Sequence, residues 1–279
     1  MSAATASATR PSGWPRGRQV WAVMKWELGR IASWRNTWLL FAAFAPVVII
    51  LAHAIKDRHH GLENETLILA AILQIFYVRF AIYFGCLGIF MRLVRGEVAE
   101  RTLHYVFLAP LRREALVVGK FLAGAVATIV VFGAAVLASF ALMYAHFPAG
   151  RAFVMNGPGL AHLRLYLLVT VLACLGYGAV LLALSLLFKN PMVPAVVVLL
   201  WEGVNGALPA WLKHFSVTFY LKPLMPVELP IAGILRLFTV VAEPTPAWRA
   251  VSGLVVFTIA VVTFACWRIR RLEISYSTD

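Results

Sequence analysis

Six blocks of apolar residues, each close to the length of a bilayer-crossing helix, constrain the fold of this chain most strongly. A helix needs about 20 apolar residues to cross a hydrocarbon core of roughly 30 Å. Only 13% of the residues are charged and 62% are hydrophobic, whereas about a quarter of the residues in a soluble domain are charged. We therefore predict an all-α integral membrane protein with six transmembrane helices. They are expected at residues 38–55, 66–91, 121–144, 165–188, 192–211 and 251–267.

The basic residues of the connecting segments predict the orientation of the chain. If the N-terminus is cytoplasmic, about twice as many lysines and arginines lie on the cytoplasmic side as outside, which is the usual bias of membrane proteins. We expect a multi-pass protein of the plasma (inner) membrane with both termini in the cytoplasm. The formal charge of +13 then requires no nucleic-acid partner, because basic flanks facing anionic membrane lipids account for it.

The residues outside the predicted spans divide into tails and one helix. Residues 1–17 are rich in Ala, Ser, Thr and Pro, which predicts a disordered cytoplasmic tail. Residues 18–36 carry apolar side chains at helical spacing among basic residues and tryptophans, which predicts an amphipathic helix in the membrane interface. The alternative is an ordinary basic flank with scattered tryptophan anchors. Residues 269–279 are predicted to be a second cytoplasmic tail.

The segment 212–249, between the fifth and sixth predicted spans, is longer than a simple connection needs. It contains five prolines and an apolar stretch at 231–241 that is too short to cross a bilayer. We predict that this segment caps the outer face of the protein, with a re-entrant or interfacial helix at 231–241.

A charged loop, residues 92–120, separates the second and third predicted spans on the predicted cytoplasmic side. Helical spacing places four polar residues on one face, opposite an apolar face. They are Glu97, Glu100, Arg101 and His104. Pro110 then ends this helix. Because a basic orientation signal needs neither carboxylates nor an amphipathic face, we predict that the 92–120 loop is a structured surface for a cytoplasmic partner.

This loop resembles the first cytoplasmic loop of type-2 ABC exporter permeases. The matching motifs are Glu97-x-x-Glu-Arg-Thr-Leu and Pro110-x-x-Arg-Glu-x-Leu-x-x-Gly-Lys120. Many members of that family have a glycine between the arginine and the threonine, and Arg101-Thr102 lacks it. The six predicted spans, the amphipathic helix before them and the capped outer side extend the resemblance over nearly the whole chain.

The resemblance implies the permease subunit of an ATP-driven exporter, paired with a second permease that is identical or paralogous, and docked on a separate ATP-binding subunit. The residues implied to contact that subunit are Glu97, Glu100, Arg101 and His104. The residues implied to shape the turn into the third span are Pro110, Arg113, Gly119 and Lys120. The chain has no Gly-x-x-x-x-Gly-Lys-Ser/Thr phosphate loop. We therefore expect no enzyme activity, cofactor or metal on this chain, with ATP and Mg on the partner.

Two charged residues fall inside predicted spans, Arg79 in the second and Glu202 in the fifth, at nearly the same predicted depth. A charge at the bilayer centre costs about 2.5–3.5 kcal/mol on insertion scales. We therefore predict a buried pair, with Gln74 and Asn205 supplying hydrogen bonds nearby. The pair either fixes helix packing or lines a substrate path.

Two other classes of function remain open from the sequence. An ion- or proton-coupled carrier would use Arg79 and Glu202 as a charge relay, and it would leave the 92–120 loop without a purpose. A membrane-embedded enzyme would need clustered acidic, histidine or serine side chains near one membrane face, whereas the 12 acids of this chain are scattered.

Overall fold

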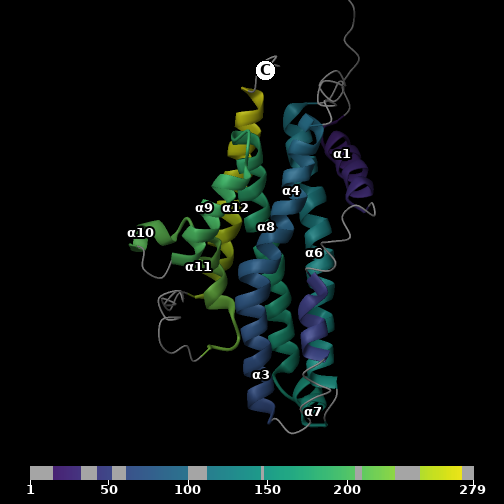
Figure 1. The fold of residues 1–279 in the computed structure, drawn as a ribbon, viewed down its shortest axis with the longest axis vertical. Helices are drawn as coiled ribbons and strands as arrows, with labels where there is room; N and C mark the ends of the chain where they lie inside the picture. The colour runs from purple at the N-terminus through teal and green to yellow at the C-terminus, as the bar shows by residue number, and fades with distance from the viewer. Residues whose placement is uncertain are drawn as a thin grey trace, which may run out of the picture.

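The fold is a bundle of long helices. A computed structural model describes residues 15–32, 43–51, 61–99, 112–145, 148–204, 209–229 and 246–271. Within these ranges the chain is helical and contains no β-strand. Figure 1 shows long helices packed side by side along one axis, with α1 (Arg16–Ile31) beside one end of the bundle. The all-α prediction is therefore confirmed for the described part of the chain.

Among the described residues, four helical segments are long and apolar enough to cross a membrane. The first runs without interruption through α3 (Leu62–Ala71), the π-helix η2 (Ile72–Ala81) and α4 (Ile82–Ala99). The others are α6 (Arg113–Ala145), α8 (Gly159–Leu187) and α12 (Ala247–Arg270). To within one residue, these segments cover the predicted spans 66–91, 121–144, 165–188 and 251–267.

The helices on either side of the 92–120 loop continue beyond their apolar stretches. The helix that begins at Leu62 continues past Arg92 to Ala99, and α6 begins at Arg113, before its apolar stretch. Lysine, arginine and glutamate favour helix almost as strongly as leucine does. At 1.5 Å per residue, α6 is about 50 Å long, which exceeds the roughly 30 Å of a hydrocarbon core. Both ends of the loop are therefore rigid helix.

The centre of the bundle is α8, which packs against α4, α6 and α12. Phe90 of α4 is 0% exposed and lies between two glycines of the neighbouring helices. A Cβ atom added to Gly124 of α6 would lie 2.6 Å from the Phe90 ring, and one added to Gly178 of α8 would lie 2.7 Å from it. These glycines let the helices approach closely, as small residues do between membrane helices.

The fifth predicted span is interrupted. Within the described residues, the helix α9 (Met192–Val204) has 13 residues and is about 20 Å long, which is less than a bilayer crossing needs. Pro209 is extended and precedes α10 (Ala210–Lys213), which is followed by two further short helices. They are α11 (Val217–Leu221) and the 3-10 helix η4 (Lys222–Leu224).

Two predictions about the spans are left open. The described part of the first predicted span is a helix at residues 43–51, so the count of six spans stays a prediction. The re-entrant or interfacial helix predicted at 231–241 lies outside the described residues. On the way from α6 to α8, the chain forms the short helix α7 (Pro148–Asn156).

Candidate functional sites at the base of α6 and in the fifth span

The predicted coupling residues are only partly described. Glu97 lies in the last turn of α4, where the backbone alone is described. Outside the described residues lie Glu100, Arg101, His104 and Pro110. Arg113, Gly119 and Lys120 all lie in the first eight residues of α6. We call residues 112–120 the base of α6, because this is where the 92–120 loop ends and the third span begins.

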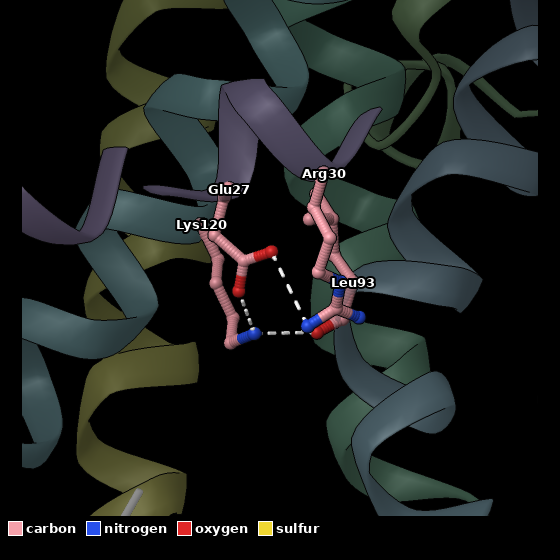
Figure 2. A network of polar contacts seen from close by, with 4 residues as sticks. All are labelled: Glu27, Arg30, Leu93 and Lys120. Carbon is pink, nitrogen blue, oxygen red and sulfur yellow. Dashed lines mark hydrogen bonds and ion pairs between the residues drawn. The ribbon is translucent and has the colours of Figure 1, made fainter. Parts of the chain in front are cut away.

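A buried ion pair joins the base of α6 to α1 (Figure 2). The Lys120 ammonium donates a hydrogen bond to Oε1 of Glu27 and a second, of 2.6 Å, to the carbonyl of Leu93 in α4. Glu27 is 0% exposed and Lys120 is 3% exposed. Arg30 lies 3.6 Å from the other carboxylate oxygen of Glu27. Three helices thus meet at one pair of opposite charges.

The rest of the contact between α1 and α6 is close packing. Gln19, Val23 and Glu27 are buried and follow one another at four-residue spacing, so one face of α1 turns toward the bundle. A Cβ atom added to Gly119 would lie 2.7 Å from the Val23 side chain. Gln19 accepts a hydrogen bond of 3.2 Å from the backbone N–H of Arg112. Because Gln19 meets residue 112 and Glu27 meets residue 120, α1 runs alongside α6 in the same direction.

The C-terminal end of α12 holds the base of α6 from another side. The Arg113 guanidinium donates to the carbonyls of Ile269 and Arg270 at 3.5 and 3.4 Å. These carbonyls belong to the last turn of α12, where the regular i to i+4 hydrogen bonds of a helix run out. Glu114 forms an ion pair of 2.5 Å with Arg270. The base of α6 is therefore fixed both to the first described helix and to the last.

Sequence reasoning placed Arg113, Gly119 and Lys120 together but missed their partners. It did not single out Gln19 or Glu27 as site residues. The available signal was a single acid on a basic amphipathic helix, at four-residue spacing from Val23. That spacing indicates a buried face, but it does not indicate which of the other helices the face contacts.

Arg79 of the second span contacts the last described turn of α9, in the fifth span. Its guanidinium Nη2 donates a hydrogen bond of 2.8 Å to the carbonyl of Gly203, in the last turn of that helix. The carbonyls near the C-terminal end of a helix carry partial negative charge, which attracts a cation. Arg79 therefore caps the C-terminal end of α9, and the cap comes from the π-helix η2 of the second span.

Glu202 of α9 is 3% exposed, and its carboxylate contacts the start of α11. Its Oε1 accepts a hydrogen bond of 2.8 Å from the N–H of Val217. Its Oε2 accepts one of 2.7 Å from the Ser216 hydroxyl and one of 3.0 Å from the N–H of Thr218. The first N–H groups of a helix lack helical partners and attract negative charge. Glu202 therefore caps the N-terminal end of α11.

The predicted polar cluster is thus brought together in part. Arg79 contacts the residue that follows Glu202, while a direct ion pair between the two stays a prediction. Gln74 donates a hydrogen bond of 2.7 Å to the carbonyl of Val227, just after η4. Asn205 lies outside the described residues. Sequence reasoning missed Ser216. It lies 14 positions after Glu202, and no helical spacing predicts a contact between residues at that separation.

The short helix α11 is wedged between α8 and α12. A Cβ atom added to Gly176 of α8 would lie 3.0 Å from Val217, and one added to Gly253 of α12 would lie 2.5 Å from the Tyr220 ring. The Tyr177 and Thr218 hydroxyls are 3.1 Å apart.

In η4, which follows α11, burial lowers the pKa of Lys222, although the negative charge of Glu228 opposes this effect.

A comparison with models of known families identifies the family of this chain. A family model described as "ABC-2 family transporter protein" matches residues 34–204, which is more than half of the chain. The chain belongs to the ABC-2 transporter family. Together with the four long apolar helices, the family identifies a multi-pass membrane protein of the permease kind. The matched range contains α3 to α9 but neither α1 nor α12, the two helices that hold the base of α6. A comparison with curated proteins finds no match.

Proposed function

We propose that this ABC-2 family protein is the permease subunit of an ATP-driven exporter, coupled through the 92–120 loop to a separate ATP-binding subunit. The main support is the base of α6. A loop that a partner pushes can move a span only if the two are rigidly connected. Here the loop ends in a helix that is fixed by the buried Glu27–Lys120 pair and by the contacts of Arg113 and Glu114 with α12.

The same contacts support the proposed orientation. Arg112 touches α1 and Arg113 touches the last residues of α12, so α1 and the C-terminal end of α12 lie at the same end of the bundle (Figure 1). This arrangement fits an even number of spans, with both chain ends in the cytoplasm of a plasma-membrane protein. Export, the second permease and the binding of ATP and Mg to the partner rest on the resemblance of the loop to type-2 exporters.

The carrier alternative gains little support from the geometry. A charge relay needs side chains that exchange protons or ions with a pathway. The hydrogen bonds of Arg79 and Glu202 instead go to the ends of α9 and α11, which is a structural use of both charges. The caps therefore favour the packing role of these residues over a substrate path.

A charge reversal in the loop tests the proposal. We expect Glu100→Lys, in the tagged full-length chain co-expressed with its proposed ATP-binding subunit, to lower recovery of that subunit roughly ten-fold or more, because like charges at an interface repel. The amount of permease in the membrane should not change. ATP hydrolysis by any complex that remains should no longer drive transport.

The matched control is Glu63→Lys, the same reversal on an exposed residue in the first turn of α3. The control should recover the ATP-binding protein as the wild type does. Equal recovery and equal transport with Glu100→Lys and Glu63→Lys would remove the 92–120 loop from the coupling.

A further inference from the structure

Two exposed tryptophans beside arginines flank the base of α6. On α1, the Arg30 guanidinium lies 5.3 Å from the ring centre of Trp26. On α12, the Arg271 guanidinium lies 4.2 Å from the ring of Trp267. Trp26 is 54% exposed and Trp267 is 45% exposed. Both pairs have a spacing of four residues, although they belong to helices at opposite ends of the sequence.

The two tryptophan–arginine pairs lie at similar positions along the axis of α6. Trp26 precedes Glu27, which contacts Lys120, and Trp267 lies one turn before Arg270, which contacts Glu114. Lys120 is the last charged residue of α6 before its apolar stretch. This height is therefore the boundary between the hydrocarbon core and the cytoplasmic headgroups, where tryptophan is enriched in membrane proteins.

The charge exposed at this boundary is positive. Arg18 and Lys25 are exposed on α1, whereas Glu27, the acid of that helix, is buried against Lys120. Trp21, between the two cations, is 63% exposed. A helix facing only water would not present two large aromatic rings among its cations, and a face against neutral lipid would not need the cations.

The surface is also held in place before any ligand arrives. The contacts of Val23 and Glu27 with the base of α6 fix the orientation of α1 about its own axis. Lys25 and Trp26 then point away from the bundle without further ordering. A binding surface that is already ordered loses less entropy when it binds.

We propose that the exposed face of α1 and the end of α12 bind anionic phospholipid headgroups of the cytoplasmic leaflet. The argument rests on Trp21, Lys25 and Trp26 of α1 and on Trp267 and Arg271 of α12. It does not depend on an ATP-binding partner, so it stands or fails separately from the proposed coupling.

The test compares lipid retention by the purified full-length chain in neutral detergent, measured by native mass spectrometry with added phosphatidylglycerol or phosphatidylcholine. The variant is Lys25→Gln with Arg271→Gln, which removes one cation from each helix and leaves the Glu27–Lys120 pair intact. A juxtamembrane cation contributes roughly five-fold to anionic lipid binding. We expect the double variant to bind phosphatidylglycerol about 25-fold more weakly, with phosphatidylcholine unchanged.

The matched control removes two cations from the predicted outer side, Lys213→Gln with Arg249→Gln. Arg249 also lies over a tryptophan, 5.4 Å from the ring of Trp248. The control therefore removes the same kind of arginine–tryptophan pair, but at the N-terminal end of α12 instead of its C-terminal end. It should bind phosphatidylglycerol as the wild type does. A second variant, Lys25→Arg with Arg271→Lys, should also retain binding because its charges are kept.

Three results would overturn the proposal. They are equal loss of phosphatidylglycerol in the outer control, no loss in the Lys25→Gln, Arg271→Gln variant, or equal retention of the two lipids by the wild type. If the cytoplasmic variant instead keeps the lipid and loses the ATP-binding protein, this face is a protein-docking surface and the lipid proposal is wrong.

Discussion

Glu27 at the base of α6 and Glu202 in the fifth span are almost equally inaccessible, with 0% and 3% of their surface exposed, but different groups compensate them. Glu27 faces the ammonium of Lys120 from another helix. Glu202 faces two backbone N–H groups and one hydroxyl at a helix end. The first arrangement depends on two side chains that can be changed together. The second depends on donors that mostly belong to the backbone.

This difference separates two uses of buried charge. At the base of α6, opposite charges join three helices and leave no net charge on the pair. In the fifth span, Arg79 contacts a backbone carbonyl in the last described turn of α9, and Glu202 contacts the first backbone N–H groups of α11, which have no partner within that helix. An ion pair specifies which helices meet, whereas a cap specifies where a helix stops.

The largest effect is expected from exchanging the two charges of the fifth span, Arg79→Glu with Glu202→Arg. A direct ion pair would tolerate the exchange, but two caps would not. A carboxylate at position 79 would face the carbonyl of Gly203, and a guanidinium at position 202 would face N–H donors. An uncompensated charge at the buried position 202 costs about 3–5 kcal/mol, and the partly buried position 79 adds to this, so we expect no folded protein on size-exclusion chromatography in detergent.

The conservative variant Arg79→Lys keeps a donor near Gly203 and should fold. Recovery of the exchanged protein to a level above that of either single reversal would show that Arg79 and Glu202 are direct partners.

A smaller effect, which can be reversed, is expected at the base of α6. Lys120→Met leaves Glu27 buried without its nearest cation and should destabilise the protein by about 3–5 kcal/mol, less if Arg30 moves closer. Adding Glu27→Gln removes the remaining charge and should restore at least half of the lost thermal stability. The measurement is Tm in detergent for the two single variants and the double variant. A double variant no more stable than Lys120→Met would mean that the two charges do not compensate each other.

The smallest effect concerns the packing around the ion pair. Gly119→Ala places a Cβ atom 2.7 Å from Val23 and should lower stability by about 1–3 kcal/mol through overpacking. Gly133→Ala is the control on the same helix, because a Cβ atom there meets nothing within 4 Å. Alanine favours helix over glycine, so the control should raise Tm slightly. Equal Tm values for the two variants would contradict the close contact between α1 and α6.

The long helices were predictable because their signal is local. Apolar length alone indicated the regions of α4, α6, α8 and α12, and helical spacing indicated a helix in the region of α1. The break after α9 had a partial signal in Pro209, but Glu202 was interpreted as a charge inside a continuous span. Its carboxylate instead receives donors from residues 216–218, at the start of α11.

The sequence indicated roughly where the residues of the candidate sites lie, but it did not indicate which groups they contact. Equal depth predicted that Arg79 pairs with Glu202, but depth does not show that the guanidinium contacts the carbonyl of the next residue, Gly203. Lys120 was identified through the loop motif, whereas its partner Glu27 lies 93 positions away. No local pattern pairs residues at that separation, because packing of several helices decides which faces meet.

That separation also sets the order in which the protein is completed during synthesis. At about 5–20 residues per second, Lys120 leaves the ribosome roughly 5–20 s after Glu27, and α1 has no docking partner in that interval. The two carbonyls that accept hydrogen bonds from Arg113 follow 156 and 157 positions after it. The base of α6 is thus among the last parts of the molecule to be finished, and a chain truncated before α12 would hold it only through α1 and α4.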